Sequence, residues 1–464
     1  QGSSQMKIES VKYSAVKNSV WRFDPSFHLS EAVQVHQLLE KSPYKMSKVD
    51  CCSDRVFLGN IFSRNFVKDK EHGVPYLAAS DTVLADIDTG TFLSKRQAND
   101  LSYLMLKKDW ILVTCSGTVG NVTYTNECFE NHIATHDLIR IVPNDKTVKR
   151  GCLYAYLSSK YGHCLLTQSE FGGVVKHIND NYVRNIPIPQ FPDNFQKKID
   201  DLVKESSDLR GKAMSALIDA DNALSKFIDT KIQPQKFKTT VASSKCFSKS
   251  LHIRLDAPPY IYDCVSIMEE LKRNKKNKLL KDLKVEISYP GIFKRTYVKE
   301  GLPYIMGSSL MERNPFKSCD FLSKTRTPKL DQLWLRENQI LITCAGRCGD
   351  AKIITKEFVQ KKAIGSPDII RVCCENAECS PEYLFVYLRH PLIKAFMQSF
   401  KYGSVIERFD AEHIGSIPII LPDNRLSMTI DKLVKEYANQ IHHSFVLEEK
   451  AISLVEKEID GWNA

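Results

Sequence analysis

Basic and small polar side chains beside glycine-containing turns are the residues of this chain best suited to chemistry. Lys and Arg neutralise phosphates, and Arg, Lys, Asn, Gln and Ser can hydrogen-bond to base edges. In the first half the candidates for such contacts are Arg64, Asn65, Lys68, Ser80, Asp81, Ser116, Thr118, His136, Lys176 and His177. In the second half they are Lys294, Arg295, Ser308, Ser309, Arg347, Lys361, Lys362, Lys401, Tyr402 and Arg408. These types predict contact with a nucleic acid, although each taken singly is more often a solvated surface charge.

Glycine-containing turns come just before two of these candidates. Gly172-Gly173 precedes Lys176-His177, and a similar turn precedes Arg408. Because glycine leaves the backbone unobstructed, such turns would let a loop approach a DNA groove closely.

The motifs that would mark an enzyme are missing from the sequence. An adenine methyltransferase needs an Asn/Asp-Pro-Pro-aromatic element to hold a flipped base, and Asn314-Pro315-Phe316 lacks the second proline, which predicts a turn. Residues 116–120 (Ser-Gly-Thr-Val-Gly) are not followed by the Gly-Lys-Ser/Thr of a phosphate-binding loop. No spacing singles out a catalytic triad. We therefore predict no catalytic residues, and expect helicase, translocase and methyl-transfer activities to belong to other proteins.

Histidine and cysteine give no metal-ligand pattern. His132 and His136 have helical spacing, but they precede a strand-like run, and the second half has Gly365 and Pro367 nearby. They are predicted to be loop histidines, of which one could touch a base or a phosphate. The 14 cysteines are spread along the chain without zinc-site spacing, which indicates reduced thiols and no structural metal.

The chain repeats itself, and the repeat defines its organisation. Residues 111–120 (ILVTCSGTVG) recur as residues 340–349 (ILITCAGRCG), and other landmarks recur in the same order at offsets of 228 to 232 residues. The paired landmarks are residues 22–24 and 254–256, 73–76 and 301–304, 137–140 and 368–371, 186–188 and 417–419, and 199–205 and 430–436. This period is far longer than that of any solenoid, so two whole domains are joined in tandem.

Size, composition and charge agree with two globular domains. A chain of 464 residues exceeds what one core usually organises, and 43% hydrophobic with 26% charged residues is an ordinary globular composition. The net charge of +10 suits a polyanionic partner without requiring one. No run of about 18 apolar residues predicts a membrane span. Residues 1–5, before Met6, are expected to be an expression-tag remnant.

Each copy is predicted to contain a short helix, a strand-rich body and a long closing helix. Apolar spacing predicts helices over residues 31–39 and 262–271, and β-rich runs predict strands at 110–114 and 339–343. Within the bodies, residues 153–166 and 382–398 are each predicted to form one helix. Residues 121–135 and 350–365, which differ between the copies, are predicted to be loops. Their divergence suits either two different DNA half-sites or simple drift of surface loops.

The closing segments carry the clearest helical pattern. After Pro192 and after Pro422, apolar and small residues alternate spacings of three and four for about 30 residues, which would span roughly 45 Å. We predict that the two helices pack on each other as a spacer. The alternative is that each is an ordinary amphipathic helix packed on its own domain.

The repeated motifs together resemble the DNA sequence-specificity (S) subunit of Type I restriction-modification systems. The matching residues are the paired turns 116–120 and 345–349, the Gly-x-Pro-Tyr segments 73–76 and 301–304, and the Ile-Pro-Ile segments 186–188 and 417–419. No single motif is specific, so the resemblance depends on their repeated order. It covers the chain from about Lys7 to the C-terminus.

The resemblance implies an α+β fold. Two tandem mixed or mainly β target-recognition domains would each be followed by a long helix, and the helices would pair as an antiparallel coiled coil with pseudo-two-fold symmetry. The implied boundaries are a first recognition domain with its N-terminal strand and helix (6–191), a central spacer helix (192–232), a linker (233–250), a second recognition domain (251–421) and a distal spacer helix (422–464).

The resemblance also implies a non-catalytic, cytoplasmic, prokaryotic function in phage defence and DNA methylation. Each domain would read one half of a bipartite duplex target, and the helices would set the spacing and dock two methyltransferase subunits. The chain itself would need no cofactor, S-adenosylmethionine being expected in the methyltransferase. Restriction or translocase subunits are further candidate partners. Two other readings stay open: a duplicated protein-interaction scaffold that never reads DNA, and a self-contained restriction enzyme, which the missing motifs disfavour.

Overall fold

The computed structural model describes residues 10–13, 16, 23, 25–168, 176–229, 256–262, 264–273 and 276–463. Segments 1–5 and 233–250 and the turn Gly172-Gly173 lie outside the described residues. None of the helices in this described part combines the length and the apolar character that crossing a bilayer requires.

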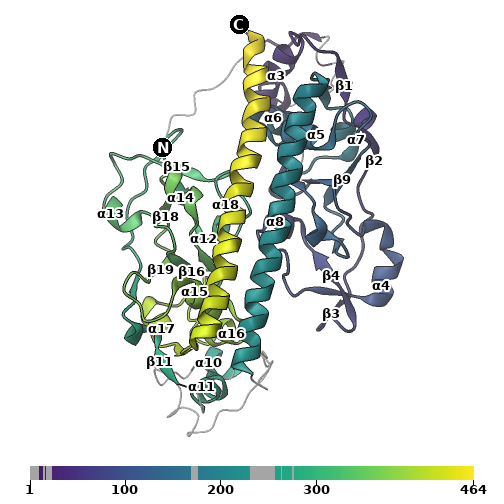
Figure 1. Ribbon diagram of the computed structural model, residues 1–464. Coiled ribbons are helices and arrows are strands. Elements are labelled where there is room, and N and C mark those ends of the chain that lie inside the picture. The colour runs from purple at the N-terminus through teal and green to yellow at the C-terminus, as the bar shows by residue number, and fades with distance from the viewer. Residues whose placement is uncertain are drawn as a thin grey trace. The chain divides into compact units, whose positions relative to one another are not determined.

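Three small sheets build the body of the first half (Figure 1). One has the strand order β2-β9-β6-β7, a second β3-β5-β4-β8, and β1 pairs with β10. All the pairings are antiparallel except β4 with β8. The strands are β1 (Met46–Lys48), β2 (Ser53–Phe57), β3 (Phe66–Val67), β4 (Gly73–Leu77), β5 (Phe92–Ser94), β6 (Ile111–Thr114), β7 (Val122–Tyr124), β8 (Ile133–Ala134), β9 (Leu138–Pro143) and β10 (Pro187–Pro189).

The second half repeats these sheets strand for strand. Its orders are β12-β19-β16-β17, β13-β15-β14-β18 and β11-β20. The strands are β11 (Asn277–Leu279), β12 (Glu286–Ser288), β13 (Tyr297–Val298), β14 (Leu302–Ile305), β15 (Asp320–Leu322), β16 (Ile340–Thr343), β17 (Ala351–Ile353), β18 (Ile364–Gly365), β19 (Ile369–Cys373) and β20 (Pro418–Ile420).

The register of the central strands also repeats. Phe57 of β2 pairs with Arg140 of β9, and Ser288 of β12 pairs with Arg371 of β19. Strands β6 and β16 are buried along their whole length, which explains why both are continuous apolar runs. The sequence repeat is therefore a repeat of topology and register, as predicted.

Helices lie before, within and after each body. In the first half they are α2 (Pro25–His28), α3 (Ala32–Leu39), α4 (Lys95–Asp100), α5 (Arg150–Ser158), α6 (Lys160–Gln168), α7 (Asp180–Arg184) and α8 (Asp193–Ile228). In the second they are α10 (Pro258–Ile261), α11 (Cys264–Lys272), α12 (Gly307–Leu310), α13 (Leu330–Leu333), α14 (Lys356–Gln360), α15 (Pro381–Arg389), α16 (Pro391–Gln398), α17 (Ala411–Gly415) and α18 (Asn424–Asp460). The helices predicted at 31–39 and 262–271 correspond to α3 and α11.

The prediction of one uninterrupted helix in each body is wrong. Residues 153–166 are divided between α5 and α6 at Ser159, and residues 382–398 between α15 and α16 at His390. Both breaking residues have extended backbones, with ψ of 163° and 136°. At His390 the cause is Pro391, which disfavours a helical conformation in the residue before it.

The prediction that residues 121–135 and 350–365 are loops is also wrong. They contain β7, β8, β17, α14 and β18, and Tyr124, Ile133 and Phe358 among them are buried. Their sequence differences therefore lie largely inside the bodies. The error arose because short strands of two or three residues leave too little alternation for a sequence pattern to reveal.

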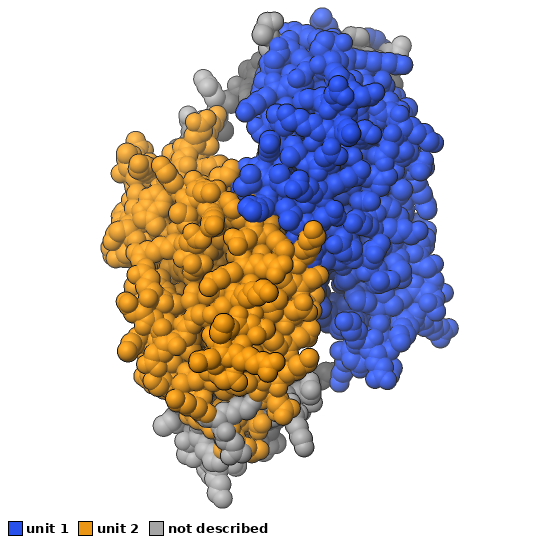
Figure 2. Space-filling view, viewed as in Figure 1, with its two compact units in different colours: residues 1–211, 443–464 blue, residues 212–442 orange. Residues whose placement is uncertain are grey.

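The long helices contribute to both compact units of the chain. Unit 1 comprises residues 1–211 and 443–464, and unit 2 comprises residues 212–442 (Figure 2). Each unit thus contains one body, part of α8 and part of α18, whereas the predicted domain boundaries simply follow the chain. Ala451, Val455 and Ile459 of α18 are fully buried in the core of unit 1.

The two helix segments of unit 1 run antiparallel. Just before α8, the ring of Phe191 lies 6.2 Å from that of Trp462, which follows α18. Farther along α8, the hydroxyls of Ser206 and Ser444 are 3.0 Å apart. Since the position on α18 decreases as that on α8 increases, the predicted antiparallel pairing is confirmed.

Candidate nucleic-acid interface

A sharp turn follows β6 in unit 1 and β16 in unit 2, and a threonine hydroxyl shapes it. The hydroxyl of Thr114 donates to the carbonyl of Thr118 at 2.6 Å and accepts the N–H of Asn121 at 3.0 Å. In unit 2 the hydroxyl of Thr343 accepts the N–H of Asp350 at 3.1 Å. Because the threonine ends a buried strand, each turn is fixed to the core.

Glycine is needed at the tip of each turn for its backbone conformation. Gly117 has φ of 72° and Gly346 has φ of 69°, and an added Cβ at either would meet no atom within 4 Å. The left-handed backbone therefore explains the glycine, and close packing does not.

A second segment is joined to each turn through the backbone. The Gly117 N–H donates to the carbonyl of Lys176 at 3.3 Å, and the Gly346 N–H donates to the carbonyl of Glu407 at 3.0 Å. β-bridges also pair Ser116 with His177 and Ala345 with Arg408. His177 and Arg408 consequently occupy equivalent places, each beside its turn.

In unit 1, further residues predicted from the sequence lie beside this turn, at the edge of the body where β6 ends. The His136 Nε2 lies 3.4 Å from the Asp137 carboxylate, and the Asp137 carbonyl accepts the N–H of Cys115 in the turn. Arg64 donates from its Nη2 to the hydroxyl of Thr135, next to His136, at 3.2 Å. Residues from four separate segments therefore lie close together.

In unit 2 two arginines at the turn are held by carboxylates. The guanidinium of Arg408 lies 3.5 Å from Asp368, and that of Arg347 lies 2.5 Å from Asp350. The two arginine side chains are still 44% and 58% exposed. Exposed guanidinium groups held in a fixed direction suit bidentate contacts with guanine or phosphate.

Lys401 and Tyr402 lie on the same segment as Arg408. The ammonium of Lys401 bonds the Glu407 carboxylate at 2.7 Å, and Tyr402 exchanges backbone hydrogen bonds of 2.9 Å with Arg408. Burial and the hydrogen bond to Asp410 raise the pKa of Tyr402 to about 12, so its phenol stays protonated. Gly403, in the turn between them, has φ of 98°.

The loop after β2 and the loop after β12 each contain one of the predicted arginines. Arg64 Nε donates to the buried hydroxyl of Tyr76 at 2.6 Å, and Arg295 Nε donates to that of Tyr304 at 2.8 Å. The charge of Asp368 also acts on Arg295. Asn65 and Lys294 are exposed neighbours of these arginines.

The predicted serine and aspartate residues form turns of their own. Ser80 and Asp81 lie in a short helix over residues Ala79–Val83, where the Asp81 carboxylate accepts a main-chain N–H of the same turn at 2.8 Å. Ser309 is buried in α12 and donates to the carbonyl three residues earlier, while Ser308 is exposed. Asp81 and Ser309 thus stabilise local structure.

Three predicted lysines lie on other elements. Lys68 is exposed just after β3, and Lys361 and Lys362 are exposed at the C-terminal end of α14. These three lysines therefore lie outside the turns and the segments bonded to them.

The loops that carry Arg64 and Arg295 contain a second repeat, which was not among the predicted landmarks. Residues 61–67 read IFSRNFV and residues 292–298 read IFKRTYV. The shared pattern Ile-Phe-x-Arg-x-aromatic-Val was available from the sequence at the same offset as the other landmarks. Only Arg64, Asn65, Lys294 and Arg295 of these segments were predicted as contacts.

The cysteines of the turns are unsuited to nucleophilic chemistry. Burial raises the pKa of the Cys115 and Cys344 thiols to about 12 in each case, so both remain protonated near neutral pH. Burial also lowers the pKa of His132. Within the described ranges, no three or more His, Cys, Asp or Glu side chains gather in a way that could hold a metal ion.

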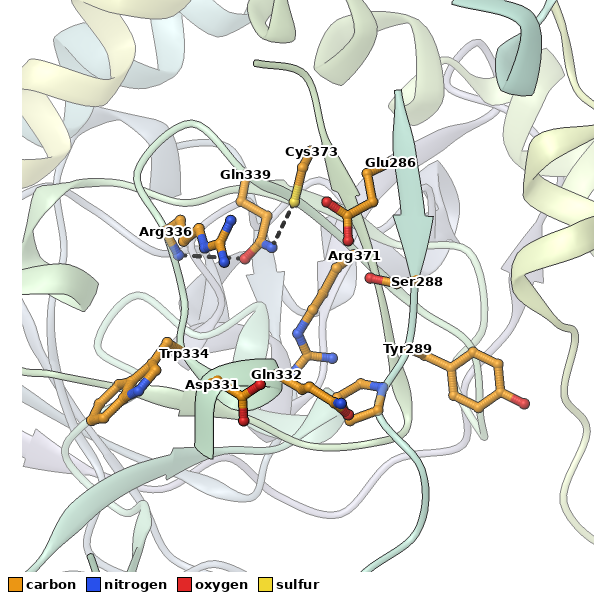
Figure 3. Close-up of a pocket in the computed structure, with 11 residues that line it drawn as sticks. Glu286, Ser288, Tyr289, Asp331, Gln332, Trp334, Arg336, Gln339, Arg371 and Cys373 are labelled. Carbon is orange, nitrogen blue, oxygen red and sulfur yellow. Dashed lines mark hydrogen bonds between the residues drawn. The ribbon is translucent and has the colours of Figure 1, made fainter. Parts of the chain in front are cut away.

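A cavity of about 450 Å³ opens in unit 2 (Figure 3). Asp331 and Trp334 line one side, Glu286 and Ser288 line the other, and Arg371 lies between them. Burial lowers the pKa of Arg371 to about 10, which leaves it charged at neutral pH. Two of its nitrogens donate to backbone carbonyls, at 2.9 and 2.8 Å.

Aromatic side chains occupy the equivalent place in unit 1. Phe57 corresponds to Ser288, because each pairs with the buried arginine, and Trp110 corresponds to Gln339, because each precedes the central strand. The rings of Phe57 and Trp110 meet edge to face at 6.1 Å. The cavity in unit 2 thus follows from replacing two large rings with Ser288 and Gln339.

A family model matches both halves of the chain. The model is described as the Type I restriction modification DNA specificity domain, and it matches residues 56–208 and 266–443. These two matches include both turns, both arginine loops and most of both bodies.

Several solved structures are similar over most of the chain. An S subunit of a Type I restriction-modification system from M. genitalium shares 14% identity, with 90% of this chain and 96% of that chain covered and a TM-score of 0.34. The HsdS subunit from Thermoanaerobacter tengcongensis shares 14% identity, with 90% and 97% covered and a TM-score of 0.27. No protein of curated function matches the sequence.

Proposed function

Because the chain belongs to the family of Type I restriction-modification DNA specificity domains, we propose that it is the DNA-recognition subunit of such a complex. Each unit reads one half of a bipartite duplex target. The subunit is non-catalytic, and cleavage or methyl transfer belongs to its partners.

One observation carries this proposal: both units build the same frame but present different side chains from it. At the turn, Thr118 in unit 1 corresponds to Arg347 in unit 2. On the joined segment, His177 corresponds to Arg408. A common frame with different exposed donors is what two domains need to read different half-sites.

The side chains at the turn and its joined segment therefore offer different hydrogen-bonding chemistry in unit 1 and unit 2. Arg347 and Arg408 suit the adjacent acceptors of guanine in the major groove, whereas Thr118 and His177 suit single hydrogen bonds or a thymine methyl group. Asp350 and Asp368 hold the arginines in one direction before DNA binds. This preorganisation lowers the entropy lost on binding.

The long helices support the assembly part of the proposal. Helix α8 has 36 residues and α18 has 37, so each extends for roughly 55 Å. Helices of this length suit half-sites about one DNA turn, roughly 34–36 Å, apart. We propose that they dock two methyltransferase subunits, which bind S-adenosylmethionine, in the cytoplasm of a prokaryotic cell.

The test is to co-express the full chain with the methyltransferase encoded beside it and to map modified bases across the host genome. The expected motif is asymmetric and bipartite. Arg408→Ala should relax one half of that motif, with discrimination against the wrong base falling about 10- to 100-fold. His177→Ala is the matched variant and should relax only the other half.

Two outcomes would contradict the proposal. If Arg408→Ala and His177→Ala relax the same half, the units do not read separate half-sites. If the wild-type complex binds duplex DNA without sequence preference and keeps its affinity at several-fold higher salt, the scaffold alternative is favoured.

A further inference from the structure

The loops after β2 and β12 share one arrangement, which points to a role beyond their arginines. We call residues 58–66 and 289–297 the tip loops. In each, an isoleucine, a phenylalanine and an arginine follow one another in the order Ile-Phe-x-Arg. Because the same order occurs in both units, the exposure and contacts of one loop can be compared with those of the other.

The isoleucines are almost fully exposed at the same place in both units. Ile61 is 85% exposed and Ile292 is 89% exposed. The aromatic residues that end the loops, Phe66 and Tyr297, are also exposed, by 53% and 54%. One exposed apolar side chain is ordinary, but the same one in both copies with the same neighbours indicates a shared contact.

A phenylalanine and an arginine anchor each tip loop just after its isoleucine. Phe62 packs against the small core cluster that includes Tyr76, and Phe293 packs against the one that includes Tyr304. The arginine two residues after each phenylalanine is hydrogen-bonded to the same tyrosine, as described above. These contacts anchor each loop directly after its isoleucine, so burying the isoleucine in the core would require them to break.

The charge around the isoleucines selects DNA as the partner. Arg64 lies in the first tip loop and Lys294 and Arg295 in the second, while Lys68 and Lys299 follow the loops, and all five are exposed. An apolar tip among cations suits a groove, where phosphates lie on either side and stacked bases lie between them.

We infer that Ile61 and Ile292 are apolar wedges that press against stacked base pairs, one in each half-site. This rests on the proposed function. Because both tip loops carry the isoleucine within the same Ile-Phe-x-Arg order, the contact of the isoleucine is the same in both half-sites and adds affinity without distinguishing sequence. Distinction between the half-sites is left to residues that differ, such as Thr118 and Arg347. Wedges of this kind bend DNA by roughly 20–90°.

The test uses the full chain with Ile61→Ser, Ile292→Ser and both together. Each single variant should weaken binding to the cognate duplex about tenfold, and the pair about a hundredfold, because the burial of one isoleucine is lost. The DNA bend measured by fluorescence energy transfer between the duplex ends should decrease. The slope of log affinity against log salt should not change, since no charge is removed.

Two control variants make the result specific. Phe23→Ser removes an apolar side chain that is 75% exposed and lies on neither long helix, and should leave affinity and bend unchanged. Ile61→Leu keeps an apolar tip and should retain both. The complex carrying Ile61→Ser should modify the same sequence as the wild type.

Clear outcomes would overturn the inference. Unchanged affinity and bend in the double variant would show that the tips do not touch the bases. Relaxation of one half of the modified sequence would show that the isoleucine reads sequence. In both cases the wild-type chain still binds its bipartite target, whereas failure of the wild type to bind any duplex is failure of the proposed function.

Discussion

The helix contacts in unit 1 and unit 2 place different chemistry at equivalent positions. In unit 1, Arg210 of α8 bonds Glu448 of α18 through two nitrogens, at 2.7 and 3.1 Å, and Tyr154 donates to the same carboxylate. The Arg210 and Glu448 side chains are only 10% and 5% exposed. In unit 2 the corresponding residues, at the offset of the repeat, are Ile441, Leu217 and Phe385.

The difference shows that this fold does not require the ionic cluster for its stability. Leu217 and Phe385 are buried, so unit 2 meets the same packing requirement with apolar groups. A buried ion pair loses hydration on both partners, and apolar replacements are often as stable or more stable. The ionic cluster in unit 1 therefore suits a role in fixing which residues of the two helices face each other.

The largest expected effect comes from breaking this cluster on one side. Glu448→Ala would leave Arg210 buried without its carboxylate, and should lower the free energy of unfolding by about 3–5 kcal/mol. Urea denaturation followed by circular dichroism measures the change.

The matched control transfers the chemistry of unit 2 into unit 1. The triple variant Tyr154→Phe, Arg210→Ile, Glu448→Leu should equal the wild type or exceed it by about 1–4 kcal/mol. A triple variant as unstable as Glu448→Ala would show that the two halves are not interchangeable.

The next effect tests the cavity that distinguishes the two bodies. Phe57→Ser in unit 1 places the residue of unit 2 beneath Trp110, and should lower the free energy of unfolding by about 3 kcal/mol, because a ring in contact is replaced by a void. The reverse variant, Ser288→Phe, enters an existing cavity and should cost less than about 1 kcal/mol. Equal losses for both variants would contradict the assignment of the cavity to these two positions.

The smallest expected effect depends on pH and distinguishes the helix breaks. In unit 2, Nδ1 of His390 accepts the N–H of Leu392 at the start of α16, and burial lowers the pKa of His390 to about 4. At the equivalent break in unit 1, the hydroxyl of Ser159 accepts the N–H of Gly162. Only the histidine can lose its acceptor by protonation.

The native state therefore binds a proton on His390 less readily than the unfolded chain, whose histidine has a pKa near 6.5. This contribution to stability is complete above about pH 6.5 and is lost as the pH falls from 6.5 toward 4, reaching about 2 kcal/mol. His390→Ser should keep the hydrogen bond and remove this dependence. Hydrogen exchange of the α15 and α16 amides from pH 7 to pH 4 measures it, and identical pH profiles for both proteins would exclude the histidine as its source.

Much of the architecture could be predicted from the sequence because it is written twice. The offset between copies identified β6 and β16, both long helices and the buried Arg140 and Arg371 as shared landmarks. Element boundaries that depend on single residues were harder to predict. The break at Ser159 has no proline to mark it, and an added Cβ at Gly162 would lie 2.2 Å from the carbonyl oxygen of Tyr156, a close approach that no spacing reveals.

The candidate interface was predicted only as a set of residue types. The side chains of Asp81 and Ser309 match base-contact chemistry, yet each bonds its own backbone. The tip-loop isoleucines were missed because an isoleucine in a sequence ordinarily predicts burial. Exposure is a property of the neighbours, so it cannot be read from the residue itself.

The sequence by itself determined that there are two copies of one α+β body, each closed by a long helix, because periodicity and repetition are local properties of the chain. Tertiary structure alone decided which residues stand together: His177 beside Ser116, Arg408 beside Ala345, and Arg210 against Glu448. These partners are separated by about 60 to 240 positions in the chain. Such pairings depend on how strands and helices pack, and a repeat shows that both copies share the packing without showing what it brings together.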